Sequence, residues 1–291
     1  MKYMKKLIII TLFATLSSQY VSAQAEHEFS AYAGGGLSTL LYSPSKGSSN
    51  AGSGGEFGVG YTFFSGKLQA AETGTVVRAK WGIHSGLGLG LYGAKAKVDK
   101  ETTIQEKIPD SDNGDLFDLH TTLTGYEETQ HAMFLNIPVM ALYEIEPYYF
   151  MAGFKFGIPL TGKFKPKNAT FSNEAEYKQY ENRLKEQEFA GLGTFRQKSP
   201  DGSVELGLTV MLSLEGGYKW RINSIFSLYT GAYFDYGLNN ALKSSPSPFV
   251  NYNYTVENPS GGFTTNSVMS AFTEKTHIMA FGVIVRLAYM K

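Results

Sequence analysis

The stretch from His277 to Tyr289 alternates large apolar residues with small or charged ones. A period of two predicts a β-strand with one apolar face and one cramped or polar face. A soluble sandwich would carry Lys, Glu and Thr on the second face. Small residues and the single Arg286 suit the narrow inside of a closed barrel, with lipid outside. The apolar set is Met279, Phe281, Val283, Val285, Leu287 and Tyr289, and the alternate positions hold Ala280, Gly282, Arg286 and Ala288, with Ile284 as the only large exception.

Seven further segments show the same alternation, so the sequence predicts an all-β fold: an eight-stranded antiparallel up-and-down transmembrane β-barrel. Their small-residue faces are rich in glycine, which leaves room for large inward neighbours such as Phe134, Met140 and Tyr149. The predicted strands are Glu28–Tyr42, Gly54–Phe64, Val76–Gly93, Gln130–Tyr143, Tyr148–Leu160, Val204–Trp220, Ile225–Leu242 and Lys275–Tyr289.

The lengths of the connections alternate, which predicts the orientation of the barrel. Long loops follow the first, third, fifth and seventh strands, whereas tight turns at 144–147 and 221–224 follow the fourth and sixth. Long outer loops and short inner turns are typical of outer-membrane barrels, and an even number of strands leaves both termini in the periplasm. A soluble all-β sandwich with long loops is the alternative.

The third long loop is expected to contain a short surface helix. Asn173-Glu-Ala-Glu176 resembles a capping box, and Glu174–Phe189 is dense in Glu, Lys and Gln. Tyr177, Tyr180 and Leu184 follow at helical spacing.

Residues 1–23 read as a secretory signal peptide, with a basic start, an apolar run at Leu7–Leu16 and a small-residue cleavage site ending at Ala23. The barrel domain is expected to occupy residues 24–291. No later apolar run is long enough for a membrane helix, and the chain has no Cys. The 26 Lys and Arg residues balance the 26 Asp and Glu residues, which gives no indication of nucleic-acid binding.

Charged residues on the small-residue faces are the candidate functional groups. A cation facing lipid near mid-membrane costs about 2–4 kcal/mol, so these side chains should turn into the lumen. They could form a structural salt-bridge plug or line a gated conductive pathway. We expect Glu215 to lie between Lys155 and Arg286, with Lys155 as the closer partner. The predicted lumen charge network is Lys155, Glu215, Arg286 and Asp235, and Arg78 and Lys80 share its inward phase.

Three patterns that could indicate chemistry are weak. The glycines of Gly88-Leu-Gly90-Leu-Tyr-Gly93 lie inside a predicted strand, whereas a dinucleotide fingerprint needs a turn before a helix. The acidic run that begins at Asp110 lacks the glycine and glutamate positions of a calcium-binding loop. The five histidines lack metal-ligand spacing. No nucleophile and base come together in the sequence, so we expect no cofactor, no metal and no enzymatic activity.

The chain resembles the OmpA-like and PorT-like outer-membrane barrels of Gram-negative cells. The resemblance rests on the strand Glu28–Gly36, on Phe134–Val139 before a tight turn, and on the terminal strand. It implies an outer-membrane location, contact with outer-membrane lipid and recognition by the barrel-assembly machinery. The terminal strand looks like an assembly signal comprising Gly282, Val285, Leu287 and Tyr289.

The expected function is that of a non-enzymatic outer-membrane protein with a structural or surface-interaction role through its long extracellular loops. An extracellular or periplasmic protein partner is possible on this reading. The alternative is a porin-like barrel, either a small-solute pore or a secretion-system accessory.

Overall fold

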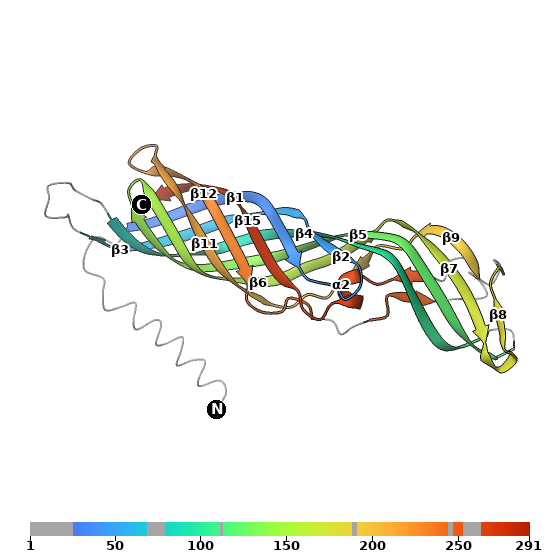
Figure 1. The fold of residues 1–291 in the computed structure, drawn as a ribbon. Helices are drawn as coiled ribbons and strands as arrows, with labels where there is room; N and C mark the ends of the chain where they lie inside the picture. The colour runs from blue at the N-terminus through green and yellow to red at the C-terminus, as the bar shows by residue number, and fades with distance from the viewer. Residues whose placement is uncertain (1–25, 69–78, 111–112, 188–190, 244–246, 253–262) are drawn as a thin grey trace, which may run out of the picture.

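Eight antiparallel strands close into a barrel in the computed structural model, which describes residues 26–68, 79–110, 113–187, 191–243, 247–252 and 263–291 (Figure 1). Each strand pairs with its neighbour along the chain, and β15 pairs with β1 to close the ring. The predicted barrel is confirmed. Its strands are β1 (Glu26–Leu41), β3 (Ser53–Leu68), β4 (Ala79–Pro109), β5 (Leu116–Ile145), β6 (Tyr148–Pro166), β11 (Thr209–Arg221), β12 (Phe226–Gly237) and β15 (His277–Met290).

Alternate side chains on the barrel wall form an apolar belt. On β4 the outward apolar positions run from Trp81 to Leu91. At about 3.3 Å per residue and a typical tilt near 40°, this run spans about 25 Å along the membrane normal. That height matches the apolar band of a membrane barrel. Belt side chains between 37% and 68% exposed include Phe29, Leu37, Phe57, Val59, Ile83, Leu87, Val139, Phe150, Phe154, Leu212, Phe281, Val283 and Leu287.

The start of β1 and the end of β15 lie at the same end of the barrel, because Glu28 pairs with Met290. The tight turns after Ile145 and Arg221 close this end too. No helix in the described part of the chain is long and apolar enough to cross a membrane.

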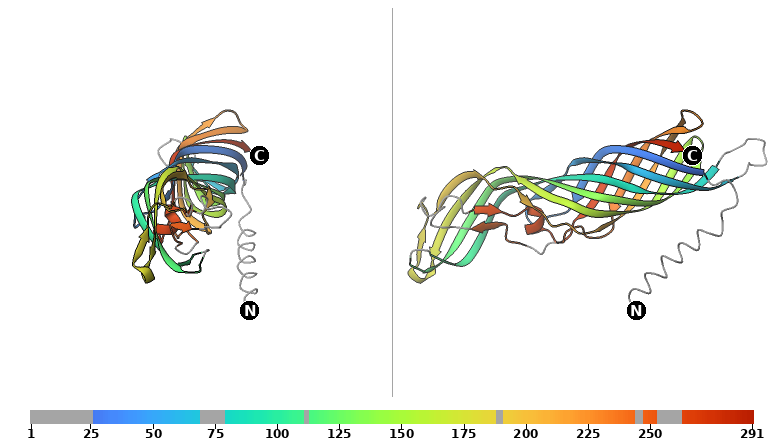
Figure 2. Two further views of the ribbon diagram at one scale, coloured as in Figure 1. Left: turned by 90° about the vertical axis from the view of Figure 1, so that its right-hand side faces the viewer. Right: turned by 180° about the vertical axis from the view of Figure 1, so that it is seen from behind.

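At the opposite end, β4 and β5 continue far beyond the barrel and carry an additional sheet (Figure 2). They contain 31 and 30 residues, whereas a membrane strand needs about 9–11. The segment 94–129, expected as a loop, is therefore mostly strand. β5 pairs here with β7, and β7 pairs with both β8 and β9. These strands are β7 (Asn168–Tyr177), β8 (Asn182–Leu184) and β9 (Gly193–Lys198).

The prediction of a helix at Glu174–Phe189 is wrong. Residues up to Tyr177 belong to β7, a 3-10 turn η1 (Lys178–Tyr180) follows, and β8 comes next. Backbone pairing with the edge of β5 outweighs the local helical pattern, because it also buries Phe171 and Ala175 on one face of β7. Phe189 lies outside the described residues.

A cap formed by the last long loop covers the inner face of this sheet. It consists of β13 (Val250–Tyr252), β14 (Phe263–Thr265) and α2 (Val268–Phe272), which is the one short helix in the described loops. Tyr126 packs edge-on against Phe249, with ring centroids 5.1 Å apart. The remaining segments are β2 (Ser48–Ala51), which pairs with β4, and β10 (Gly202–Ser203), which pairs with β6.

The pairing of β5 with β7 can be tested by cross-linking, because the protein has no cysteine of its own. Thr122 lies directly opposite Ser172, and such cross-strand pairs have the spacing a disulfide needs. We expect T122C/S172C to form a disulfide on mild oxidation, detected by gel mobility after proteolysis. The control T122C/N173C places the two thiols on opposite faces and should stay reduced. Equal cross-linking of both variants would contradict this register.

Candidate functional site: the lumen and its cap

An ion pair inside the lumen joins Arg286 on β15 to Glu215 on β11, past the intervening strand β12. The guanidinium Nη2 lies 2.8 and 2.7 Å from the two carboxylate oxygens. The Tyr149 hydroxyl donates a third hydrogen bond to Glu215 at 3.0 Å. Arg286 is 3% exposed and Glu215 9%, so the pair is shielded from water and its attraction is only weakly screened.

A second cluster surrounds Lys155 on β6. Its ammonium donates to Glu56 at 2.8 Å and to Asp235 at 2.7 Å. The Ser213 hydroxyl donates to the other oxygen of Asp235 at 2.6 Å. All of these groups are buried, so one cation joins strands β3, β6 and β12 across the inside of the barrel.

A third cluster lies near the end with the short turns. Lys219 donates to both oxygens of Glu144, at 2.8 and 3.0 Å. The Tyr229 hydroxyl lies between Glu144 and Glu28, at 3.3 and 2.8 Å. Lys80 pairs with Glu26 beside this cluster. Strands that are not neighbours in the sheet are again joined by buried charged hydrogen bonds.

Aromatic side chains fill the space between these clusters, and glycines on the inward face make room for them. A Cβ at Gly88 would lie 2.3 Å from the Tyr32 hydroxyl, and one at Gly231 would lie 2.6 Å from the Tyr149 hydroxyl. The predicted role of the inward glycines is therefore confirmed at these positions. Further buried lumen side chains are Tyr92, Phe134, Met140, Met151, Met211 and Tyr233.

All four residues of the predicted lumen charge network point inward and are at most 9% exposed. The expected contact between Glu215 and Lys155 is wrong, because Lys155 binds Glu56 and Asp235 instead. The register of β6 and β11 is the reason: Lys155 lies opposite Met211, four residues from Glu215 along the strand. Arg78 lies outside the described residues.

The sequence interpretation missed five of the charged and tyrosine side chains in these clusters. Each occupies the inward phase of its strand, so strict alternation from the neighbouring outward residues would have identified it. Glu56, for example, precedes the outward Phe57 on β3. Glu144 was missed because it was assigned to a turn. The five residues are Glu28, Glu56, Glu144, Lys219 and Tyr229.

A buried carboxylate holds the cap onto the mouth of the barrel that lies opposite the short turns. Glu128 accepts hydrogen bonds from the Ser267 hydroxyl at 2.6 Å and from the Val268 backbone amide at 3.0 Å, both at the start of α2. Tyr126 and Gln130 also donate to it, at 2.7 and 2.5 Å. Glu128 lies beyond the apolar belt, and burial raises the pKa of its carboxyl above the ordinary value of 4.5.

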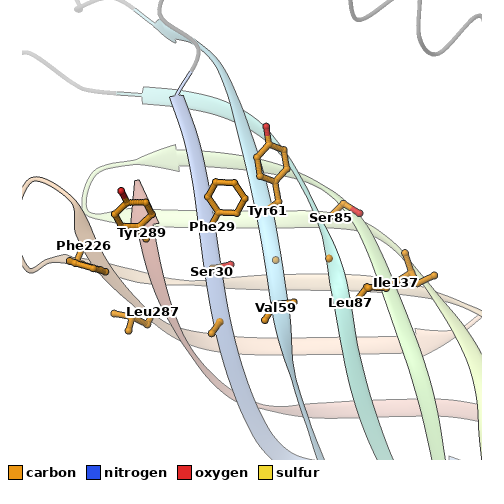
Figure 3. A pocket seen from close by; sticks show the side chains of 13 residues that line it. Phe29, Ser30, Val59, Tyr61, Ser85, Leu87, Ile137, Phe226, Leu287 and Tyr289 are labelled. Atoms are coloured by element: carbon orange, nitrogen blue, oxygen red, sulfur yellow. The ribbon is translucent and has the colours of Figure 1, made fainter. Parts of the chain in front are cut away.

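A shallow groove of about 790 Å³ lies on the outer wall, within the apolar belt (Figure 3). Its lining is largely hydrocarbon and includes Phe29, Val59, Leu87 and Leu287. A groove of this composition and position belongs to the lipid-contacting wall of the barrel.

Four of the histidines in the described residues, His27, His84, His120 and His277, make side-chain contacts. His84 contacts the Thr62 hydroxyl at 2.9 Å, and His120 contacts Glu176 at 2.9 Å. Across the described ranges, no three His, Asp or Glu side chains gather where they could hold a metal ion. The assembly-signal residues Val285, Leu287 and Tyr289 face outward on β15, and their role in assembly stays a prediction.

Comparison with known proteins agrees with this geometry. The model of an outer membrane protein β-barrel domain matches residues 17–243. The chain belongs to this family. Membership supports an outer-membrane location for the barrel and for its apolar belt. The comparison with curated proteins gave no match.

A solved structure of a Pseudomonas aeruginosa FadL homologue aligns with 91% of this chain and 89% of its own, at 6% identity and a TM-score of 0.14. Similarity at that level supports no inference about the fold or function of this outer-membrane barrel.

The ion pairs of the outer-membrane barrel can be tested with double-mutant cycles. Arg286→Met and Glu215→Gln should each lower the free energy of unfolding by about 3 kcal/mol, because each leaves a buried group unpaired. The double variant should lose at least about 1 kcal/mol less than the sum. Urea unfolding in lipid vesicles, followed by tryptophan fluorescence, measures these values. The control cycle between Lys155→Met and Glu215→Gln should show a smaller coupling energy. A larger coupling in the control would contradict the observed pairing.

The raised pKa of Glu128 predicts how the cap responds to pH. Between 4.5 and the higher pKa of the folded state, the folded cap binds a proton more tightly than the unfolded chain. Cap stability should therefore be greatest below pH 4.5 and fall as pH rises through the folded pKa. Hydrogen exchange of α2, corrected for the intrinsic rate, should be slower at pH 4.5 than at pH 7.5. Glu128→Gln should abolish this difference, whereas Glu127→Gln on the outer surface should keep it. Faster corrected exchange at pH 4.5 would overturn the assignment.

Proposed function

We propose that this protein is a non-enzymatic surface-interaction barrel of the Gram-negative outer membrane, related to the OmpA-like and PorT-like barrels. On this proposal residues 1–23 direct export and are removed, and the barrel anchors the chain. The long ends of β4 and β5, with β7 to β9, project outside the cell. The terminal strand serves as the assembly signal read by the barrel-assembly machinery.

The single observation that carries the proposal is the exposed face of the projecting sheet. A row of four hydroxyl residues crosses four strands in register: Thr102 on β4, Thr122 on β5, Ser172 on β7 and Thr194 on β9. Two neighbouring pairs within this row are hydrogen-bonded, at 3.0 and 3.3 Å. The opposite face of the sheet is buried beneath the cap. A rigid, one-sided and solvent-facing surface of this kind suits contact with an external partner.

The filled lumen supports an anchoring role rather than solute passage. An eight-stranded barrel is just wide enough for its own side chains. Here the buried ion pairs of Lys155, Lys219 and Arg286 lie between fully buried aromatic rings. A water path would have to separate these pairs.

The proposal is tested by substituting residues on the exposed face and comparing the phenotype of the resulting strain with that of a strain lacking the gene. Replacing Thr122, Ser172 and Thr194 by Arg should leave the heat-modifiable barrel intact and make the strain behave like a deletion strain. The matched variant T122S/S172T/T194S keeps every hydroxyl and should behave like the wild type. Wild-type behaviour of the Arg variant would show that this face is not the functional surface.

Conductance separates this proposal from a pore. Purified protein in planar bilayers should give no steady channels. Regular ohmic current steps from the wild-type barrel would instead support the small-solute pore.

A further inference from the structure

Five lysines gather on one side of the barrel, on the outward faces of β4 and β6 and directly after β6. This lysine patch is defined as Lys95, Lys97, Lys163, Lys165 and Lys167. The register brings its members together across β5: Lys95 lies opposite Thr129, and Thr129 lies opposite Lys165. All five lysines are exposed, and His131 is exposed beside Lys163.

The patch begins where the apolar belt ends. On β4, Leu91 is the last apolar belt residue, and Lys95 and Lys97 are the next outward residues to carry a charge. On β6, the exposed Leu160 is followed three residues later by Lys163. A charged band directly above a hydrocarbon-facing wall lies at the depth of lipid headgroups. The apolar stem of lysine can follow the wall while its ammonium reaches the headgroup layer.

The charge of the patch is only partly balanced by the protein. Lys97 pairs with Asp99 at 2.8 Å, and Lys167 pairs with Glu127 at 2.7 Å. None of the ion pairs in the described ranges involves Lys95, Lys163 or Lys165. Five positive charges against two negative ones leave a net charge of +3 on this surface.

The patch is confined to one side of the barrel. The outer ends of β1 and β12 and the approach to β11 expose leucines: Leu37, Leu41, Leu238 and Leu208. The exposed charges nearby are of both signs and balance one another, with Lys243 beside Glu205 and Lys275 beside Glu274. A cluster on two strands and the one between them fits an anionic group bound at a defined place.

We propose that the lysine patch binds the phosphate headgroup of a lipid in the outer leaflet. The inference rests on the outward orientation given under the proposed function. The ammonium groups of Lys95, Lys163 and Lys165 donate to the phosphate oxygens, while the acyl chains lie along the belt below, beside Leu91 and Leu160. Phosphate supplies the negative charge that the patch lacks, and three long, flexible lysine side chains can reach its several acceptor oxygens from both sides of β5.

Lipid retention tests the proposal. The full barrel is placed in phosphatidylcholine bilayers containing either 5 mol% phosphatidic acid or the same amount of diacylglycerol with identical acyl chains. After extraction into mild detergent, native mass spectrometry counts the lipids retained. We expect at least about tenfold more phosphatidic acid than diacylglycerol on the wild type, and a marked reduction of this ratio in 1 M salt, because salt screens exposed charges. Equal retention of the two lipids would overturn the proposal without any variant.

Variants locate the site. K95Q/K163Q/K165Q should reduce the preference for phosphatidic acid to less than about twofold while keeping heat-modifiable mobility. The matched control K100Q/K185Q/K198Q removes the same charge from the projecting sheet and should keep the wild-type ratio. Wild-type retention by the first variant, or equal loss in both, would refute the patch as the site.

Displacement of the lipid by millimolar inorganic phosphate would point to a free-anion site and also refute it. These measurements are independent of the conductance and strain phenotypes that test the proposed function.

Discussion

Backbone hydrogen bonding within the membrane is the constraint on which this structure depends. Hydrocarbon offers no partners to peptide groups, so a sheet can span a bilayer only if it has no open edge. Here β15 meets β1 along a ladder from Glu28–Met290 to Leu41–His277, which closes the ring. Once the ring is closed, each strand must show one face to lipid and the other to a narrow interior. The alternation of large and small residues along the chain follows from that requirement.

Charged side chains inside the ring must find their ion-pair and hydrogen-bond partners within the protein. Charged side chains at inward positions cannot reach bulk water, so each needs a partner from another strand. Arg286 and Glu215 form one such connection, and Lys155 with Glu56 and Asp235 forms another. Because these links join strands that are not hydrogen-bonded to each other in the sheet, they hold the barrel to one shape. A barrel built in this way is a rigid base for the sheet that projects from it.

The lysine patch flanks β5 on strands β4 and β6, and the projecting sheet is the continuation of β4 and β5. The strands that cross the membrane continue without interruption into the sheet, so any force on the sheet passes directly into the barrel wall. Attachment of this wall to lipid headgroups through Lys95, Lys163 and Lys165 would limit tilting of the barrel under the projecting sheet. The lipid contact and the external surface therefore act on one continuous element.

The sequence by itself determined the strands of the barrel, the faces they show to lipid and the inward direction of Lys155, Glu215, Asp235 and Arg286. Those properties depend on whether a residue occupies an odd or an even position along its strand, and the local sequence contains that information. Tertiary structure alone decided which charges meet, because the register between strands sets the height of each side chain; Lys155 lies opposite Met211 and so misses Glu215. It also made residues 168–177 a strand, since an open sheet edge on β5 was available to pair with them. Local patterns cannot report the presence of that edge, because it is formed by a segment about fifty residues away in the chain.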